Sequence, residues 1–294
     1  MEQTVDINRN FDAISPTAKW ILLMKGHTDI PFARQAAELI QYPEKFIPDF
    51  QKKDLGFWAR TLHFEARYWS INQLLKDISV QNILELSAGF SFRGLDFATK
   101  ENVYYIDTDL PDMIEQKQPM VLELMKSAGS LKGKLELLPL NALDGAKFNE
   151  IANRFPPGEV AIVNEGLLVY LDQAEKERLC EVIRDVLRKR GGYWITGDIY
   201  LKVNNRNVEL TLDEKTKKIF EEQQVEAKRF ESFGAAEAFF KKMGFVIDKE
   251  AEPDYTAFSS FPFLISNSSE ADLLKMLDVG KIHATWRLKL AEGS

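Results

Sequence analysis

The residues best suited to chemistry in this 294-residue chain are acids and amides that follow short apolar runs. The runs cover residues 82–86, 103–107, 135–140, 160–164 and 193–196, and each predicts a strand. The polar residues at or just beyond their ends are Glu85, Ser87, Asp107, Asp109, Asn141, Asp144, Asn164, Glu165 and Asp198. Parallel strands bring their carboxyl ends to one edge of a sheet, where ligands bind. An edge this acidic suits a ligand with hydroxyls, an amine or a cation better than a pyrophosphate.

The turn after the first run excludes a standard dinucleotide fingerprint. That fingerprint needs glycine at three positions, where this chain has Ser87, Gly89 and Phe92. A dehydrogenase is therefore disfavoured. The turn still lets the backbone approach a ligand at Ser87–Gly89, and an ordinary strand-to-helix turn is the alternative interpretation.

Two acids follow the second run at a distance typical of ribose binding. Asp107 and Asp109 lie 18 and 20 residues after Gly89, and an acid about 20 residues past such a turn can accept both ribose hydroxyls. For Asp109, capping of a helix before Pro111 is the alternative. Glu165 emerges from a buried run and therefore needs a partner, which would be an amine, a sulfonium or a nearby arginine.

The pattern that positions these residues is an alternation of strands and helices, which predicts a parallel α/β sheet. The clearest helix is Gln173–Arg190, with a capping box from Asp172 and Glu175 and a stop at Gly191. The range 284–290 alternates apolar and polar residues and predicts a half-exposed antiparallel strand. It pairs with a predicted strand at 244–247, which follows a helix at 234–243.

Other segments lack strand patterns. Residues 1–80 predict a helical N-terminal cap, with helices at 30–41 and 57–77, and residues 81–294 form the second predicted unit. A polar insertion at about 200–233, with a predicted helix at 213–225, is expected to act as a lid.

Composition excludes several classes of protein. The net charge of −7 argues against nucleic acid and anionic membranes as partners. The single cysteine, Cys180, cannot form an intrachain disulfide. One cysteine and three histidines in the whole sequence also argue against a structural zinc site, which usually takes four Cys or His ligands. Apolar stretches of about five residues are far shorter than the roughly 20 of a membrane span. The first residues lack the apolar core of a secretory signal, so we expect a cytoplasmic protein without a metal.

Three segments together resemble the leucine carboxyl methyltransferase family, which includes bacterial polyketide-type O-methyltransferases. They are NILELSAG at 82–89, YYIDTDLP at 104–111 and NEGLLVYL at 164–171. The resemblance runs from about Ser15 to Arg190. It implies a Rossmann-like class I methyltransferase fold, an α/β fold whose seven-stranded, mostly parallel sheet has an antiparallel last strand. It also implies S-adenosylmethionine as cofactor and an oxygen as methyl acceptor.

Carried over position by position, the resemblance implies binding roles. Arg67 matches the arginine that pairs with the methionyl carboxylate, and Lys19 matches a second basic residue there. Asp109, with Asp107 beside it, matches the ribose-binding acid, and Glu165 matches an acid near the cofactor. The remaining matches are Ser87, Ala88 and Gly89, through their backbone, and Asn141 and Ala142 near the adenine. The family has glycine in place of Ser87 and an Asp-Leu pair in place of Asn141-Ala142.

The predicted reaction is in-line methyl transfer to a carboxylate or phenolic oxygen of a small molecule. A carboxylate acceptor needs no base, whereas a phenol would use one, and His63, His27 and Asp198 are the candidates. Tyr170 and Tyr200 are predicted either to contact the acceptor or to pack. Two alternatives stay open, a protein C-terminal carboxyl methyltransferase and a cofactor-binding protein without turnover. The sequence indicates no oligomeric state.

Overall fold

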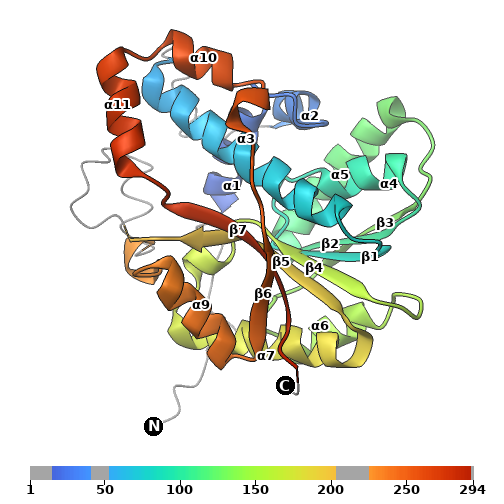
Figure 1. Cartoon of the computed structure of the whole chain (residues 1–294). Helices are drawn as coiled ribbons and strands as arrows, with labels where there is room; N and C mark the ends of the chain where they lie inside the picture. The colour runs from blue at the N-terminus through green and yellow to red at the C-terminus, as the bar shows by residue number, and fades with distance from the viewer. Residues whose placement is uncertain (1–14, 41–52, 203–224, 293–294) are drawn as a thin grey trace.

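A seven-stranded sheet forms the centre of the computed structural model, which describes residues 15–40, 53–202 and 225–292 (Figure 1). The strand order is β3-β2-β1-β4-β5-β7-β6, and β7 alone runs antiparallel to its neighbours. The strands are β1 (Asn82–Leu86), β2 (Tyr104–Asp109), β3 (Lys134–Pro139), β4 (Val160–Asn164), β5 (Gly192–Tyr200), β6 (Phe245–Glu250) and β7 (His283–Leu290). The predicted seven-stranded sheet with an antiparallel last strand is confirmed.

The central strands are buried on both faces because successive side chains point to opposite sides of the sheet. Every residue of β1 and β4 is buried. Within β4, Ala161 and Val163 pack on one face, and Val160 and Ile162 on the other. The short apolar runs at 82–86 and 160–164 are therefore the fully buried strands β1 and β4.

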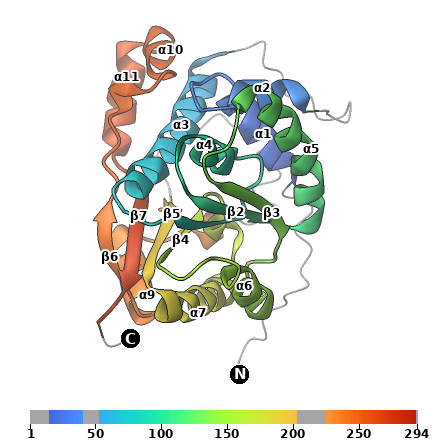
Figure 2. The ribbon, with the colours of Figure 1, turned by 90° about the vertical axis from the view of Figure 1, so that its right-hand side faces the viewer.

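Helices cover each face of this sheet in separate layers (Figure 2). On one face lie α3 (Leu55–Lys76), α4 (Arg93–Lys100) and α5 (Pro111–Ala128). On the other lie α6 (Gly145–Ala152), α7 (Gln173–Arg190) and α9 (Phe233–Lys242). The bounds of α7 and its capping box between Asp172 and Glu175 are as predicted. The chain passes from β3 back to β4 across β1, so the order of the strands reverses between β1 and β4.

Two short helices, α1 (Ser15–Lys25) and α2 (Ala33–Leu39), pack against α3 and α5. The predicted helix at 30–41 is shorter in the structure because Phe32, with φ of 64°, takes a left-handed conformation just before it. In the described part of residues 1–80, the regular elements are helices, as the sequence predicts. The boundary between a cap and a second unit stays a prediction.

The prediction of a half-exposed β7 is wrong. Residues 284–288 are all buried, including the polar Thr285 and Arg287. Arg287 is accommodated because it donates to Asp248 at 2.7 Å and to Asp77 at 3.0 Å. The polar face of this strand is therefore covered by protein, because Arg287 on that face meets carboxylates and not water.

A helical segment between β6 and β7 has no counterpart in the sequence prediction. It consists of η5 (Tyr255–Ala257), α10 (Phe261–Ser266) and α11 (Glu270–Val279), and α10 packs against α3 (Figure 1). Glu65 on α3 anchors it, because its two carboxylate oxygens accept hydrogen bonds from the backbone and hydroxyls of Ser259 and Ser260.

The predicted insertion at 200–233 is only partly described, since residues 203–224 and most of the predicted helix at 213–225 lie outside the described residues. Its two ends pair with each other, because Phe230 N donates to Tyr200 O and Lys202 N donates to Phe230 O. The short helix η4 (Glu226–Lys228) precedes this pairing, and Lys228 also donates to Tyr170 O at 2.8 Å. In the part of the chain that the structure describes, none of the helices has the length and apolar character to cross a membrane.

Candidate functional site

A cavity of about 590 Å³ lies over the carboxyl ends of the strands, beside the point where the strand order reverses. This is where open α/β sheets bind ligands, and its size is typical of a small-molecule site. Residues from both of the packed helices α1 and α3 and from the loops after β1, β2, β3, β4 and β5 line it. The sequence prediction of a site at these strand ends is matched by a cavity.

One face of α3 supplies side chains to this cavity. Arg60, His63, Phe64 and Arg67 all line it, and their spacing of three or four residues places them on the same side of the helix. The helix approaches β5 closely at Gly197, where a Cβ atom would lie 3.2 Å from Arg67 Cγ and 3.0 Å from Ile71 Cδ1. Glycine at this position therefore sets how near Arg67 comes to the sheet.

The cation that α1 contributes is Lys25, and Lys19 does not line the cavity. Lys25 comes six positions after Lys19, an offset that turns the two side chains about 120° apart around an α-helix of 3.6 residues per turn. The predicted role of Lys19 is therefore not supported by its position. Sequence reasoning missed Lys25, although its spacing of seven residues from Ala18, which also lines the cavity, places both on one helical face.

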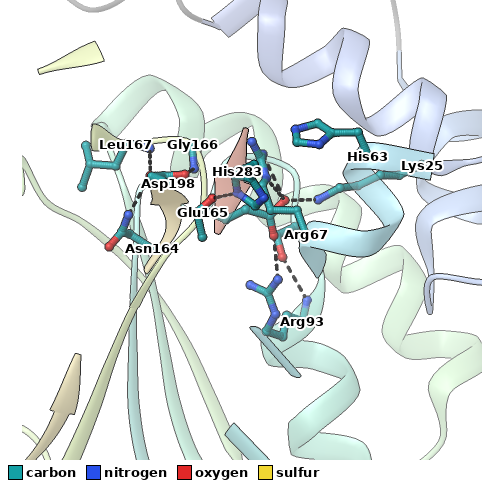
Figure 3. A network of polar contacts seen from close by, with 12 residues as sticks. Lys25, His63, Arg67, Arg93, Asn164, Glu165, Gly166, Leu167, Asp198 and His283 are labelled. Atoms are coloured by element: carbon teal, nitrogen blue, oxygen red, sulfur yellow. Dashed lines mark hydrogen bonds and ion pairs between the residues drawn. The ribbon is translucent and has the colours of Figure 1, made fainter. Parts of the chain in front are cut away.

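Glu165 is the centre of a buried ionic cluster (Figure 3). Its Oε1 accepts from Lys25 Nζ at 2.6 Å and from Arg67 Nη2 at 3.1 Å, and its Oε2 accepts from Arg93 Nη2 at 2.6 Å. Arg93 also pairs with the buried Glu85, which accepts from Tyr105 Oη at 2.6 Å. The partner that the sequence required for Glu165 is thus a set of three cations from α1, α3 and α4.

These contacts fix the charges of the cluster. Burial alone would raise the pKa of Glu165, but Lys25, Arg67 and Arg93 hold it well below its ordinary value. Burial would lower the pKa of Arg67, yet Tyr200, Glu165 and Asp198 raise it. Glu165 is therefore a carboxylate and Arg67 a guanidinium, and only 5% of the Glu165 side chain is exposed.

The two acids of β2 have different positions. Asp109 lines the cavity, and its carboxylate accepts from the backbone N–H groups of Gly89 and Leu110, both at 2.7 Å. Asp107 does not line it; it is 1% exposed and pairs with the buried Lys117 at 2.6 Å. Asp107 and Asp109 are two residues apart and so point to the same face of the sheet. Asp109 is the last residue of β2 and reaches the cavity beyond the strand end, whereas Asp107 lies further back and packs beneath α5.

The turn after β1 has an unusual backbone. Ser87 has φ of 48° and Gly89 has φ of 47°, both in the left-handed region. An L-residue such as Ser87 pays about 1–2 kcal/mol for this conformation, which glycine adopts freely. Ser87, Ala88 and Gly89 all line the cavity, as predicted for a turn that brings backbone to a ligand.

The loop after β3 brings Asn141 and Ala142 to the cavity, together with Leu140 and Leu143. Asn141 Oδ1 accepts from Leu143 N at 3.0 Å, which fixes the loop. Two further predicted residues, Tyr170 and Tyr200, also line the cavity. Of the residues predicted to bind the cofactor or the acceptor, Lys19 and Asp107 are the ones that the structure leaves outside the lining.

Asp198 has a structural role that excludes it as a base. Its carboxylate accepts from the backbone N–H groups of Gly166, Leu167 and Leu168, between 2.6 and 3.0 Å, and from Asn164 Nδ2 at 2.7 Å (Figure 3). Asp198 lies in the interval between Thr196 and Ile199, where the register of β5 against β7 shifts. A bulge of this kind changes the direction of the side chains within it. Asp198 therefore holds the loop that carries Glu165.

Of the three candidate bases, His63 alone lines the cavity. Its Nε2 lies 2.7 Å from Tyr200 Oη, which accepts from Arg67 Nη1 at 2.9 Å. His283 lies beside this pair, with a ring centroid 5.1 Å from that of His63, and its Nε2 donates to Gly197 O at 2.7 Å. Burial lowers the pKa of His63 well below its ordinary value, with His283, Arg67 and Arg229 acting in the same direction against Glu165.

The strand order and the cavity over the strand ends define a Rossmann-like fold of the class I methyltransferase type. No family model matches the chain, and no curated protein matches it. The chain is similar in structure to a DUF574 family protein from Streptomyces avermitilis, with a TM-score of 0.52, 14% identity, and coverage of 94% of this chain and 97% of that one. This similarity shows a shared fold.

Two further solved structures are methyltransferases. The magnesium protoporphyrin IX methyltransferase of Synechocystis PCC 6803, with bound SAH, has a TM-score of 0.49 and 10% identity, and the match covers 89% of this chain and 96% of that one. The mitomycin 7-O-methyltransferase has a TM-score of 0.48 and 9% identity, with coverage of 80% and 57%. Membership of the leucine carboxyl methyltransferase family stays a prediction from the sequence segments.

Proposed function

We propose that this chain is an S-adenosylmethionine-dependent O-methyltransferase that acts on a carboxylate or phenolic oxygen of a small molecule. The observation that carries the proposal is the joint presence in one cavity of Asp109, at the end of β2, and of the cations Lys25 and Arg67. The ribose of the cofactor needs a carboxylate that accepts hydrogen bonds from its two hydroxyls. The amino-acid end needs basic side chains that pair with its α-carboxylate.

The residues present fit this cofactor. Asp109 is held by two backbone N–H groups, and each of its oxygens keeps a lone pair for a ribose hydroxyl. Arg67 and Lys25 would bind the methionyl carboxylate, with Glu165 fixing their positions. Asn141 and Ala142 would contact the adenine beside the apolar Met113 and Leu143, which line the same cavity.

The cofactor supplies an already activated methyl group on a cationic sulfur. The protein therefore has to bind, orient and exclude water, and orientation of this kind can lower a barrier by about 7–11 kcal/mol. Apolar and aromatic side chains, Trp20, Ile21, Phe64 and Val169, line the part of the cavity formed by α1, α3 and the loop after β4. This part would hold the acceptor away from water.

Calorimetry with S-adenosylmethionine and with its demethylated product tests the cofactor, and a labelled-methyl assay over carboxylic acids, phenols and peptides tests the transfer. Asp109→Asn should weaken binding of both ligands roughly 10-fold or more, because a charge-assisted hydrogen bond is worth about 1.5–3 kcal/mol. Asp185→Asn, on the outer surface of α7, is the matched control. Binding without any methyl transfer would favour a non-catalytic binding protein, and transfer to peptides alone would favour a protein carboxyl methyltransferase.

A further inference from the structure

Beyond the cofactor site, the cavity contains a hydrogen-bonded pair that the cofactor does not need. Tyr200, at the end of β5, and His63, on α3, both line the cavity and meet at 2.7 Å. The sequence separation of 137 residues means that only the packing of α3 on β5 brings them together. Neither residue forms a hydrogen bond with Asp109 or with the turn after β1.

The lone pairs of Tyr200 Oη define what this pair can bind. One accepts from Arg67 Nη1 at 2.9 Å. If the proton of His63 is on Nδ1, the Tyr200 hydroxyl donates to His63 Nε2 and one lone pair stays open. That open lone pair accepts a hydrogen bond, so it suits an incoming hydroxyl group.

We propose that Tyr200 and His63 are catalytic residues that bind and deprotonate the hydroxyl of a phenolic acceptor. This inference rests on the proposed methyltransferase function and selects the phenol over the carboxylate. The apolar and aromatic lining near the pair, which includes Phe64, Trp20 and Ile282, suits an aromatic ring.

The step balances in atoms and charge. The acceptor oxygen forms a bond to the methyl carbon as the carbon–sulfur bond of the donor breaks, and that electron pair stays on sulfur. The acceptor proton passes to Tyr200 Oη while the Tyr200 proton passes to His63 Nε2, and solvent later takes it from the imidazolium. The cavity loses a sulfonium charge and gains an imidazolium charge, so its net charge is unchanged during the step.

The surroundings of the pair are consistent with these roles. Burial, His283, Arg67 and Arg229 lower the pKa of His63 against Glu165, so the imidazole is neutral at rest but a weaker base than an exposed histidine. It gains its proton as the sulfonium charge disappears, so the cavity never holds both positive charges. Burial raises the pKa of Tyr200, with Asp198 acting in the same direction and Arg67 and Arg229 opposing, so Tyr200 keeps its proton at rest. Arg67 at 2.9 Å stabilises negative charge that develops on Tyr200 Oη during the transfer.

Acceptors of different acidity test the proposal. With a phenol whose pKa is near 10, His63→Gln and Tyr200→Phe should each lower kcat roughly 100-fold or more, the usual contribution of a positioned base. With a nitrophenol that is already ionised, the same variants should lose less than about 10-fold, since no base is then needed. Tyr104→Phe, which loses hydrogen bonds to Glu136 and Lys134 outside the cavity, is the matched control.

A second measurement does not depend on activity. Nitrogen NMR of the full chain with bound demethylated product should assign the His63 proton to Nδ1, with His63→Gln identifying the signal. A proton on Nε2, or equal losses for both phenols, would overturn the proposal. Transfer to carboxylic acids alone would also overturn it while leaving the methyltransferase function intact, whereas absence of cofactor binding would remove that function itself.

Discussion

Lys25 Nζ lies 2.6 Å from Glu165 Oε1 and so ties α1 to the loop after β4, across 140 residues of sequence. Both side chains are less than a tenth exposed, at 7% and 5%. The contact completes a cluster in which Arg67 and Arg93 hold the same carboxylate. Since Lys25 and Arg67 also line the cavity, the buried ionic cluster forms part of the cavity wall.

Removing the carboxylate of this cluster should be strongly destabilising. Glu165→Gln leaves three buried cations without their shared anion, and breaking a buried pair in this way costs about 3–5 kcal/mol. Urea unfolding measures the loss. Lys25→Met in the Glu165→Gln background should recover part of it, because one uncompensated cation is removed; a double variant whose loss equals the sum of the two single losses would contradict the cluster.

The basic residues of the cavity should differ in their effect on ligand affinity. Arg67→Ala should weaken binding of the demethylated product by roughly 10- to 150-fold, the equivalent of about 1.5–3 kcal/mol. Calorimetry measures the affinity, and Arg154→Ala, whose guanidinium pairs with Glu136 outside the cavity, is the control. Lys25→Met should also weaken binding by more than Lys19→Met does, and the reverse order would return Lys19 to the site.

The close approach of α3 to β5 should depend on Gly197. A methyl group there would lie 3.0 Å from Ile71 Cδ1 and 3.2 Å from Arg67 Cγ, so Gly197→Ala should cost about 1–3 kcal/mol of overpacking and displace Arg67. Thermal unfolding and product affinity should both fall. Gly234→Ala is the matched control, because its new methyl would come no nearer than 3.8 Å to Ser232 Oγ. Equal stability of the two variants would argue against a tight contact at Gly197.

One surface ion cluster should make stability depend on pH. Glu136 accepts from Tyr104, Arg154 and Lys134, and these partners, against the opposing effect of burial, lower its pKa to about 2. A depressed carboxyl pKa stabilises the fold above the ordinary value of 4.5, and this contribution is lost as the pH falls toward 2. The stability advantage of the wild type over Glu136→Gln should therefore be constant above about pH 5 and shrink below it. Urea midpoints across this range measure the difference, and a gap that did not narrow would exclude Glu136 as its source.

Local sequence patterns determined much of the fold. The apolar runs that became β1 and β4 were predicted with their observed bounds, because most residues of a strand buried on both faces are apolar. The helix α7 was predicted as well, because its capping box and terminal glycine are local signals. The turn at Ser87–Gly89 and Asp109, which strand-end patterns singled out, and Arg67, which the resemblance singled out, all line the cavity, and their binding roles stay predictions.

The tertiary structure decided the contacts between distant elements. Whether Lys19 or Lys25 enters the cavity depends on the rotation of α1 against α3, and no pattern within α1 states it. The burial of Arg287 on β7 depends on Asp248 on β6 and on Asp77, which follows the last residue of α3. The pairing of His63 with Tyr200 follows from the packing of α3 on β5. Sequence periodicity reports which residues avoid water, whereas the partner of a buried polar group is set by helices and strands that meet only when the chain has folded.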